Sequence, residues 1–227
     1  MSIQPVFADF VKGSLRLEIK SICYNRVLAR PPLLSMSKEI VLDIETQNTF
    51  EDVGGWHHDK LRISLVGVYF FETDSYEYFL EPDLPKLWPR LEQADRIIGY
   101  NQKGFDNPVM NNYYAGDLNQ IPQLDLLEKI HQTLGYRVKL DDVAKSTLGM
   151  GKSGHGLQAV EFWKEGKIQE LADYCLQDVR VTKEIYEFAR EHGHVLFEDR
   201  MGQVHEIAFS VAPEVELAAS INLSMPL

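Results

Sequence analysis

The chain has 227 residues, of which 44% are apolar, and a formal net charge of −11. This length and apolar content are those of a globular domain with a full core, which excludes a chain that is disordered throughout. Its two cysteines, Cys23 and Cys175, lie far apart without histidines at zinc spacing, so we expect neither a disulfide framework nor a structural zinc site, which suits a reducing cytoplasm. No apolar run reaches the roughly 20 residues of a spanning helix, so we expect no membrane contact and a cytoplasmic location.

The acidic charge alone disfavours a nucleic-acid partner, because sequence-independent affinity for phosphates comes mainly from Lys and Arg. A nuclease with a metal site is a different case, since bound divalent cations supply positive charge at the scissile phosphate. The charge therefore favours an ordinary acidic protein, but it leaves room for a metal-dependent nuclease that contacts only a few nucleotides.

The first residues of the chain differ in composition from the rest. Residues 1–35 are mainly basic and end in the sequence Arg30–Pro32. We expect an N-terminal extension there, which is either an organellar transit sequence or sequence upstream of a true start at Met36. It precedes a domain over residues 36–209 and a frayed C-terminal tail over residues 210–227.

The regular pattern begins with a short buried strand, Ile40–Leu42. Leu61–Phe71 and Tyr76–Leu80 are rich in β-branched and aromatic residues and are predicted as antiparallel strands joined at Thr73–Ser75. Next come a helix over Asp83–Ala94, a strand over Arg96–Tyr100, a helix over Asn107–Tyr114 and a fifth strand near Gln120–Leu124. This order resembles an RNase H-like α/β domain, in which helices flank a mixed five-stranded sheet.

The rest of the domain is predicted to be helical up to a final hairpin. The predicted helices are Asp125–Leu134, Leu140–Thr147, Leu157–Trp163 and a long one from Lys167 to about Glu191. Val195–Phe197 and Val204–Ile207 flank a turn at Asp199–Gly202 and are predicted as the hairpin.

Asp43 and Glu45 are the first candidates for chemistry. They stand two residues apart at the end of the first predicted strand, so their side chains project on the same side. Coulomb repulsion makes such a pair unfavourable unless a cation or a proton intervenes, which is the property that metal sites use. Taken alone, this pattern is more often a solvated strand end.

Asp106 is the third candidate carboxylate. A strand over Ile97–Gly99 runs into a glycine-containing loop that brings Asp106 to a helix start marked by Pro108. The alternative is that Asp106 caps that helix, and the two roles are compatible.

The long helix supplies the fourth carboxylate. One of its faces carries Leu171, Cys175, Asp178, Thr182 and Ile185. Asp178 therefore lies on or beside the inward face, where an unpaired charge costs on the order of several kcal/mol and needs a cation or a strong hydrogen-bond partner. Tyr174 lies one turn earlier on the same face, where its phenol could hold a water beside a metal; core packing is the alternative.

Together these segments resemble the DEDD exonuclease superfamily, whose three motifs match Asp43–Glu45, Asn101–Asp106 and Tyr174–Asp178. A tyrosine four residues before the last aspartate marks the DEDDy branch, which includes proofreading domains of DNA polymerases. The other branch has a histidine five residues before that aspartate, where this chain has Asp173.

This resemblance implies a metal-dependent 3′-5′ exonuclease that hydrolyses single-stranded DNA or RNA, with a role in DNA repair among the expectations. Asp43, Glu45 and Asp178 would hold one divalent cation, and Asp43 and Asp106 the second. Oxygen-only ligands favour Mg²⁺ or Mn²⁺ over zinc. Tyr174 would orient the attacking water, because a phenol with an ordinary pKa of about 10 stays protonated at neutral pH.

Three further residues are candidates for substrate binding. Asn101 could hold the terminal nucleotide by hydrogen bonds and Phe105 by stacking, although core packing of Phe105 is an equal alternative. Gly149–Gly156 resembles half a phosphate loop, but Ser146 replaces the first glycine and no strand precedes it, so we expect no ATP. Lys152 in this loop is either a contact to the nucleic-acid backbone or part of a plain connector.

The segments Lys139–Ala144 and Thr147–Gly149 also resemble the helical linker of bacterial RNase H-like exonuclease domains that are often fused to helicases. The alternatives are a protein that acts alone and one that docks to a separate helicase or polymerase. Two other functions compete: a catalytically silent RNase H-like nucleic-acid-binding or scaffold module, and a nuclease that trims oligonucleotides or structured RNA ends.

Overall fold

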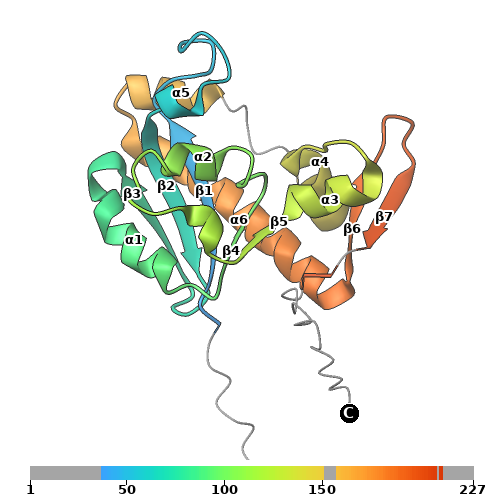
Figure 1. Cartoon of the computed structure of the whole chain (residues 1–227). Coiled ribbons are helices and arrows are strands. Elements are labelled where there is room, and N and C mark those ends of the chain that lie inside the picture. Colours follow the sequence, from blue (N-terminus) through green and yellow to red (C-terminus); the bar gives the residue numbers. More distant parts are fainter. Residues whose placement is uncertain (1–36, 151–156, 209, 212–227) are drawn as a thin grey trace, which may run out of the picture. The chain divides into compact units, whose positions relative to one another are not determined.

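The computed structural model describes residues 37–150, 157–208 and 210–211. The predicted extension, Lys152 and nearly all of the predicted tail lie outside these ranges. The described residues form a five-stranded sheet in the order β3-β2-β1-β4-β5 and a two-stranded hairpin, β6-β7 (Figure 1). β1 pairs antiparallel with β2 and parallel with β4, so the sheet is mixed and the predicted RNase H-like α/β fold is confirmed.

The elements follow one another as strands and helices with short 3-10 turns between some of them. The strands are β1 (Glu39–Thr46), β2 (Ile63–Phe70), β3 (Ser75–Leu80), β4 (Arg96–Gly99), β5 (Gln123–Asp125), β6 (His194–Glu198) and β7 (Val204–Ala208). The helices are α1 (Leu84–Glu92), α2 (Asp106–Met110), α3 (Leu126–Leu134), α4 (Leu140–Leu148), α5 (Leu157–Lys164) and α6 (Ile168–His192).

β1 divides the core because its side chains alternate between the two faces of the sheet. Ile40, Leu42 and Ile44 belong to an apolar cluster that also contains buried residues of α1 and α2. Val41 belongs to the cluster on the opposite face, which contains buried residues of α6. Asp43 and Glu45 share the face of Val41, so both carboxylates are directed toward α6.

α6 is the longest helix, with 25 residues, and it crosses the face of the sheet beside β1 and β2 (Figure 1). Its apolar residues recur at helical spacing and pack on the sheet, and it ends at Gly193, whose φ of 75° is readily adopted only by glycine. A sheet covered by this helix on one face and by α1 and α2 on the other holds the candidate carboxylates between layers. None of the helices in the described ranges is both long and apolar enough to cross a membrane.

Glu39 at the start of β1 is buried in a polar cluster. The Arg96 guanidinium forms an ion pair with it, and the Tyr186 hydroxyl donates a hydrogen bond to its Oε2 at 2.8 Å. Arg96 also donates to the carbonyl of Val211 at 2.6 Å, and Val211 is buried. The chain is therefore still packed on the core just beyond residue 210, where we had predicted a frayed tail.

Several boundaries differ from the predictions. β1 continues to Thr46 because β2 pairs with it over almost its whole length, so Asp43 and Glu45 lie within the strand. α2 ends at Met110, and a 3-10 turn occupies the predicted start of the fifth strand, so β5 is shorter and later. Pairing between distant strands decides such boundaries, and local composition does not reveal it.

Candidate active site

Asp43 and Glu45 lie side by side on β1, facing α6, and both are partly exposed. One ligand atom from each, together with the Cys175 sulfur, lies within 4.8 Å of the others. Burial raises the pKa of Asp43 well above its ordinary value, and the negative charges of Asp106, Glu45 and Asp178 raise it further. The pKa of Glu45 is raised by burial and by the same aspartates of α2 and α6. The four carboxylates therefore form one electrostatic cluster.

Gly67 on β2 sets how closely α6 approaches the sheet beside Asp43. It is paired with Asp43 across the two strands. A Cβ atom at this position would lie 2.7 Å from the Cys175 Sγ and 3.2 Å from the Val179 Cγ2, closer than packed atoms come. Glycine in the middle of a strand often marks such an approach of another element. This residue was missed in the sequence, although its place within an apolar strand was the available signal.

Cys175 lies beneath the carboxylates and is fully buried. Its Sγ lies 3.5 Å from the Asp43 backbone oxygen and 3.7 Å from Oδ2 of the same residue. Burial raises the pKa of the thiol well above its ordinary value, and Asp43 and Glu45 raise it further. The sulfur therefore stays protonated and donates to Asp43 rather than acting as a thiolate ligand.

Asp106 comes after β4, the strand that pairs in parallel with β1, and after the loop that follows β4. It is the first residue of α2 and is only 4% exposed, and its Oδ1 accepts a hydrogen bond from the Ile44 backbone N–H at 3.1 Å. Ile44 separates Asp43 and Glu45, so this bond fixes Asp106 beside both. Burial raises the pKa of Asp106 to about 7. Asp106 follows the N-cap position of α2, which is Phe105, and a hydrogen bond from its own backbone N–H acts to lower its pKa, so a role at the helix start is compatible with its place in the cluster.

Asp178 and Tyr174 come from α6 and are partly buried. Asp178 adds to the negative charge that raises the pKa of Asp43 and Glu45. Burial raises the pKa of the Tyr174 phenol well above its ordinary value, and the charges of Asp178, Glu45 and Asp43 raise it further. Tyr174 is therefore a neutral phenol near the carboxylates of Asp178, Glu45 and Asp43.

The loop before Asp106 is held by a carboxylate that we did not single out from the sequence. Asp125, at the end of β5, accepts hydrogen bonds from the backbone N–H groups of Asn101 and Lys103 at 2.9 and 3.2 Å and caps α3. Asn101 has a φ of 73°, and its side-chain oxygen accepts from the Arg137 guanidinium. The candidate substrate residue Asn101 is thus fixed next to the cluster.

Phe105, the other candidate for substrate binding, precedes Asp106 and is partly buried. Its ring packs edge-on against Phe50 and His58 at centroid distances of 5.8 and 6.1 Å. Both partners belong to the loop between β1 and β2. Phe105 also packs against the apolar cluster that contains Val109 and Met110, as the core-packing alternative predicts.

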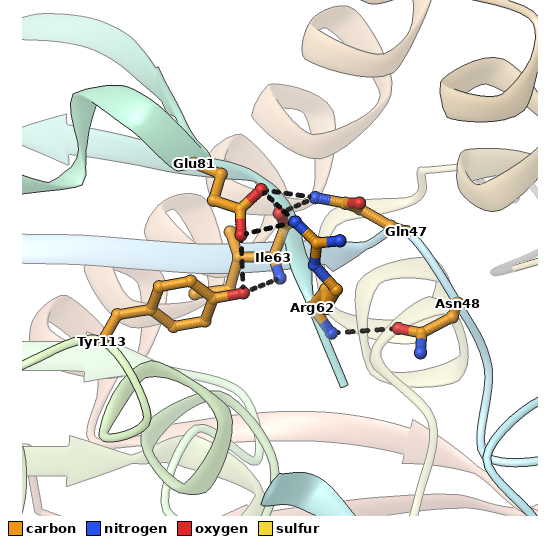
Figure 2. A network of polar contacts seen from close by, with 6 residues as sticks. All are labelled: Gln47, Asn48, Arg62, Ile63, Glu81 and Tyr113. Carbon is orange, nitrogen blue, oxygen red and sulfur yellow. Dashed lines mark hydrogen bonds and ion pairs between the residues drawn. The ribbon is translucent and has the colours of Figure 1, made fainter. Parts of the chain in front are cut away.

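A polar network fixes the base of that loop (Figure 2). Glu81, just after β3, accepts hydrogen bonds from the side chains of Gln47 at 2.8 Å, Arg62 at 3.2 Å and Tyr113 at 3.1 Å. Burial acts to raise the pKa of Glu81, but these hydrogen bonds outweigh burial and lower the pKa. The chain that leaves β1 after Glu45 is thereby anchored to the start of β2.

The donor set fits divalent cations. Asp43, Glu45 and Asp106 each lie near other carboxylates. Among the described residues, no Lys, Arg or His forms an ion pair with any of the three. Oxygen-rich sites of this kind suit Mg²⁺, Mn²⁺ or Ca²⁺. A cation would offset the repulsion that raises the pKa values of these groups.

The fold and this acidic cluster define an RNase H-like nuclease domain. In agreement, residues 40–190 match the sequence profile of the RNase_H_2 family, RNase_H superfamily. Because the match covers more than half of the chain, the chain belongs to the RNase H superfamily. Comparison with curated protein sequences gave no significant match.

Among solved structures, the chain is similar to the family B DNA polymerase of the hyperthermophilic archaeon Pyrobaculum calidifontis. The TM-score is 0.53 at 20% sequence identity, and the similarity covers 66% of this chain. It covers only 24% of the polymerase chain, so it concerns a part of that protein and supports the fold alone.

Proposed function

We propose that this protein is a metal-dependent 3′-5′ exonuclease of the DEDDy type that hydrolyses single-stranded nucleic acid. The observation that carries the proposal is the cluster of four carboxylates from β1, α2 and α6 beside a neutral tyrosine, in which the charges of Asp106 and Asp178 raise the pKa values of Asp43 and Glu45. Such a cluster is unfavourable in a purely structural role, and cations make it favourable. The order of the three motifs along the chain supports the DEDDy assignment.

In this proposal Asp43, Glu45 and Asp178 hold one cation, and Asp43 and Asp106 hold the second. When bound, the cations would supply Lewis-acid activation of a water and neutralisation of negative charge at the phosphodiester. The hydrogen bond from Cys175 restrains the Asp43 side chain, and the bond from Ile44 restrains Asp106, so both are oriented before cations bind. Tyr174 orients the water without deprotonating it, because its raised pKa keeps the phenol neutral.

The chain's own charge is consistent with a short contact with substrate. A net charge of −11 supplies little general attraction for phosphates, so binding must come from the cations and a few local contacts. We propose that the strand enters with its 3′ end near Asn101 and Phe105. The resemblance of Lys139–Ala144 and Thr147–Gly149 to the linker of helicase-associated exonuclease domains, together with the DEDDy motifs, makes a separate helicase or polymerase a partner to test.

The test is digestion of single-stranded DNA and RNA of graded length, each labelled at either end, with Mg²⁺ or Mn²⁺. Asp178→Ala should abolish cleavage, whereas Asp173→Ala, an exposed carboxylate on the same helix, should retain it. Chelator should stop the reaction. The DNA and RNA arms identify the sugar, and the length series identifies a trimming nuclease.

Equal cleavage by the wild type and Asp178→Ala would reveal a contaminating nuclease and overturn the proposal. Binding of single strands without cleavage under any metal condition would instead favour the silent binding module. Release of mononucleotides from a 5′-labelled strand with the label retained in shortening products would support 3′-5′ polarity.

A further inference from the structure

The loop between β1 and β2, residues 47–62, carries an aromatic side chain that packing does not explain. Trp56 is 82% exposed, one of the largest exposures among the big apolar side chains in the described ranges. Within the described part of the chain, the ring that packs against it is that of Phe50, at a centroid distance of 4.5 Å. An apolar ring left in water on a folded loop gives up hydrophobic stabilisation, and contact of its free face with a planar ligand would recover it.

The rings of this loop form a series of contacts that ends at Phe105, the residue before Asp106. Phe50 contacts Trp56 on one side and Phe105 on the other, with centroid distances of 4.5 and 5.8 Å, and His58 packs against both phenylalanines. Phe105 is followed directly by Asp106. We call Phe50, Trp56, His58 and Phe105 the aromatic row; it runs from solvent to the apolar cluster beside α1 and α2 and ends at the residue that precedes Asp106 in the chain.

The loop is built to present Trp56. Gly54 and Gly55, which precede it, have φ values of 79° and 138°, so the turn requires glycine. The Gly55 N–H donates to the Phe50 carbonyl at 2.8 Å, and Asn48 bridges to the Arg62 N–H and the Lys60 carbonyl. The loop therefore holds the indole in place before any ligand arrives, and little ordering entropy is lost on binding.

The charges of the loop indicate which part of a nucleic acid it binds. Glu51, Asp52 and Asp59 are exposed on it, against the exposed cations Lys60 and Arg62, and the Arg62 guanidinium is already paired with Glu81. This balance disfavours the phosphate backbone. Planar bases are uncharged, and each presents a π-face that stacks on tryptophan.

From these observations we infer that Trp56 is a stacking platform for one unpaired base of the substrate strand, upstream of the terminal nucleotide near Phe105. This rests on the proposed function for the identity of the substrate. It assigns Trp56 a substrate-binding role away from the reacting atoms. The platform selects single strands, because a base that is paired and stacked within a duplex does not offer its face to the indole.

The experiment is a double-mutant cycle between the indole and a base. Full-length Asp178→Ala protein, and the same protein with Trp56→Ala or Trp56→Phe, are titrated with fluorescent single strands. Each strand carries one abasic residue at a successive position from the 3′ end. Tyr78→Ala, which removes an exposed aromatic side chain from β3, is the matched control.

Trp56→Ala should weaken binding of the intact strand about tenfold, and one abasic position should weaken wild-type binding equally. At that position the two losses should not add. Trp56→Phe should retain most of the affinity, and Tyr78→Ala should have no effect. In the active protein Trp56→Ala should raise KM and leave kcat nearly unchanged.

Additive losses at every position would overturn the platform, and so would a Trp56→Ala protein that binds strands normally but loses self-association in sedimentation. Cleavage by the wild type with no coupling would leave the exonuclease proposal intact. Coupling without cleavage by the wild type would support the platform while the exonuclease proposal fails. The two failures are therefore distinct.

Discussion

The carboxylates at the two ends of β1 differ in whether the fold neutralises their charge. Glu39 at the start is buried with an Arg96 ion pair and a Tyr186 hydrogen bond. Asp43 and Glu45, on the same face of the same strand, are near other carboxylates, and their pKa values are raised. Glu39, which an arginine of the fold neutralises, has a structural role. Asp43 and Glu45, which lie close to other negative charges, are suited to binding a cation.

The largest expected effect comes from exchanging one charge at each end. Asp43→Asn should lower cleavage on the order of a thousandfold, because it removes an oxygen ligand from both proposed cations. It should leave the metal-free protein as stable or more stable, because repulsion within the cluster falls. Glu39→Gln should show the opposite balance, with a much smaller loss of cleavage and a lower free energy of unfolding, because Arg96 loses its buried partner.

Cleavage rates and urea unfolding in chelator measure both quantities for both variants. The comparison fails if Asp43→Asn is destabilised as much as Glu39→Gln, since the two carboxylates would then be held in the same way.

The second prediction concerns pH. Burial and like charges raise the pKa of Asp43 and Glu45, and burial raises that of Asp106 to about 7. A carboxyl whose pKa is raised in the folded state stabilises that state below its unfolded pKa of about 4, and this contribution is lost as pH rises through the folded pKa. In chelator the free energy of unfolding should therefore fall on the order of 3 kcal/mol between about pH 4 and pH 8 through these groups.

Millimolar Mg²⁺ should flatten this decline, because bound cations favour the ionised carboxylates. Thermal unfolding across pH, with and without Mg²⁺, gives the slopes, and Asp43→Asn should have the shallower one in chelator. A wild-type slope that neither Mg²⁺ nor this substitution changes would place the titrating groups elsewhere.

The third prediction is the smallest and concerns the spacing between α6 and the sheet. Gly67→Ala puts a methyl group 2.7 Å from the Cys175 sulfur, so it should destabilise the protein by about 1–3 kcal/mol. It should also raise the Mg²⁺ concentration needed for half-maximal cleavage, because α6 carries Asp178.

Cys175→Ala removes the closest contact, so the double variant should recover part of both losses. Cys175→Ala alone is the control, because it removes the sulfur and its contact with Asp43 without adding a methyl group at position 67. Metal dependence equal to that of the wild type in Gly67→Ala would mean that helix spacing does not govern the cluster.

The sequence predicted the sheet and the long helix well, because alternation and helical spacing are local properties. It could not decide the role of Asp106, since the bond to the Ile44 N–H joins residues 62 positions apart. The sulfur contact of Cys175 and the need for Gly67 depend on how closely α6 approaches β2. Trp56 drew no attention because its exposure is visible only in the folded loop.

α6 joins the two ends of β1 through one stiff body. Tyr186 touches the Glu39 pair, and Asp178 stands eight residues earlier on the helix, about 12 Å along its axis. A shift of the helix at its C-terminal half is therefore passed to the cluster instead of being absorbed by a flexible joint. Arg96 is buried and distant from the proposed nucleic-acid site, yet selection for catalysis should constrain it through this helix.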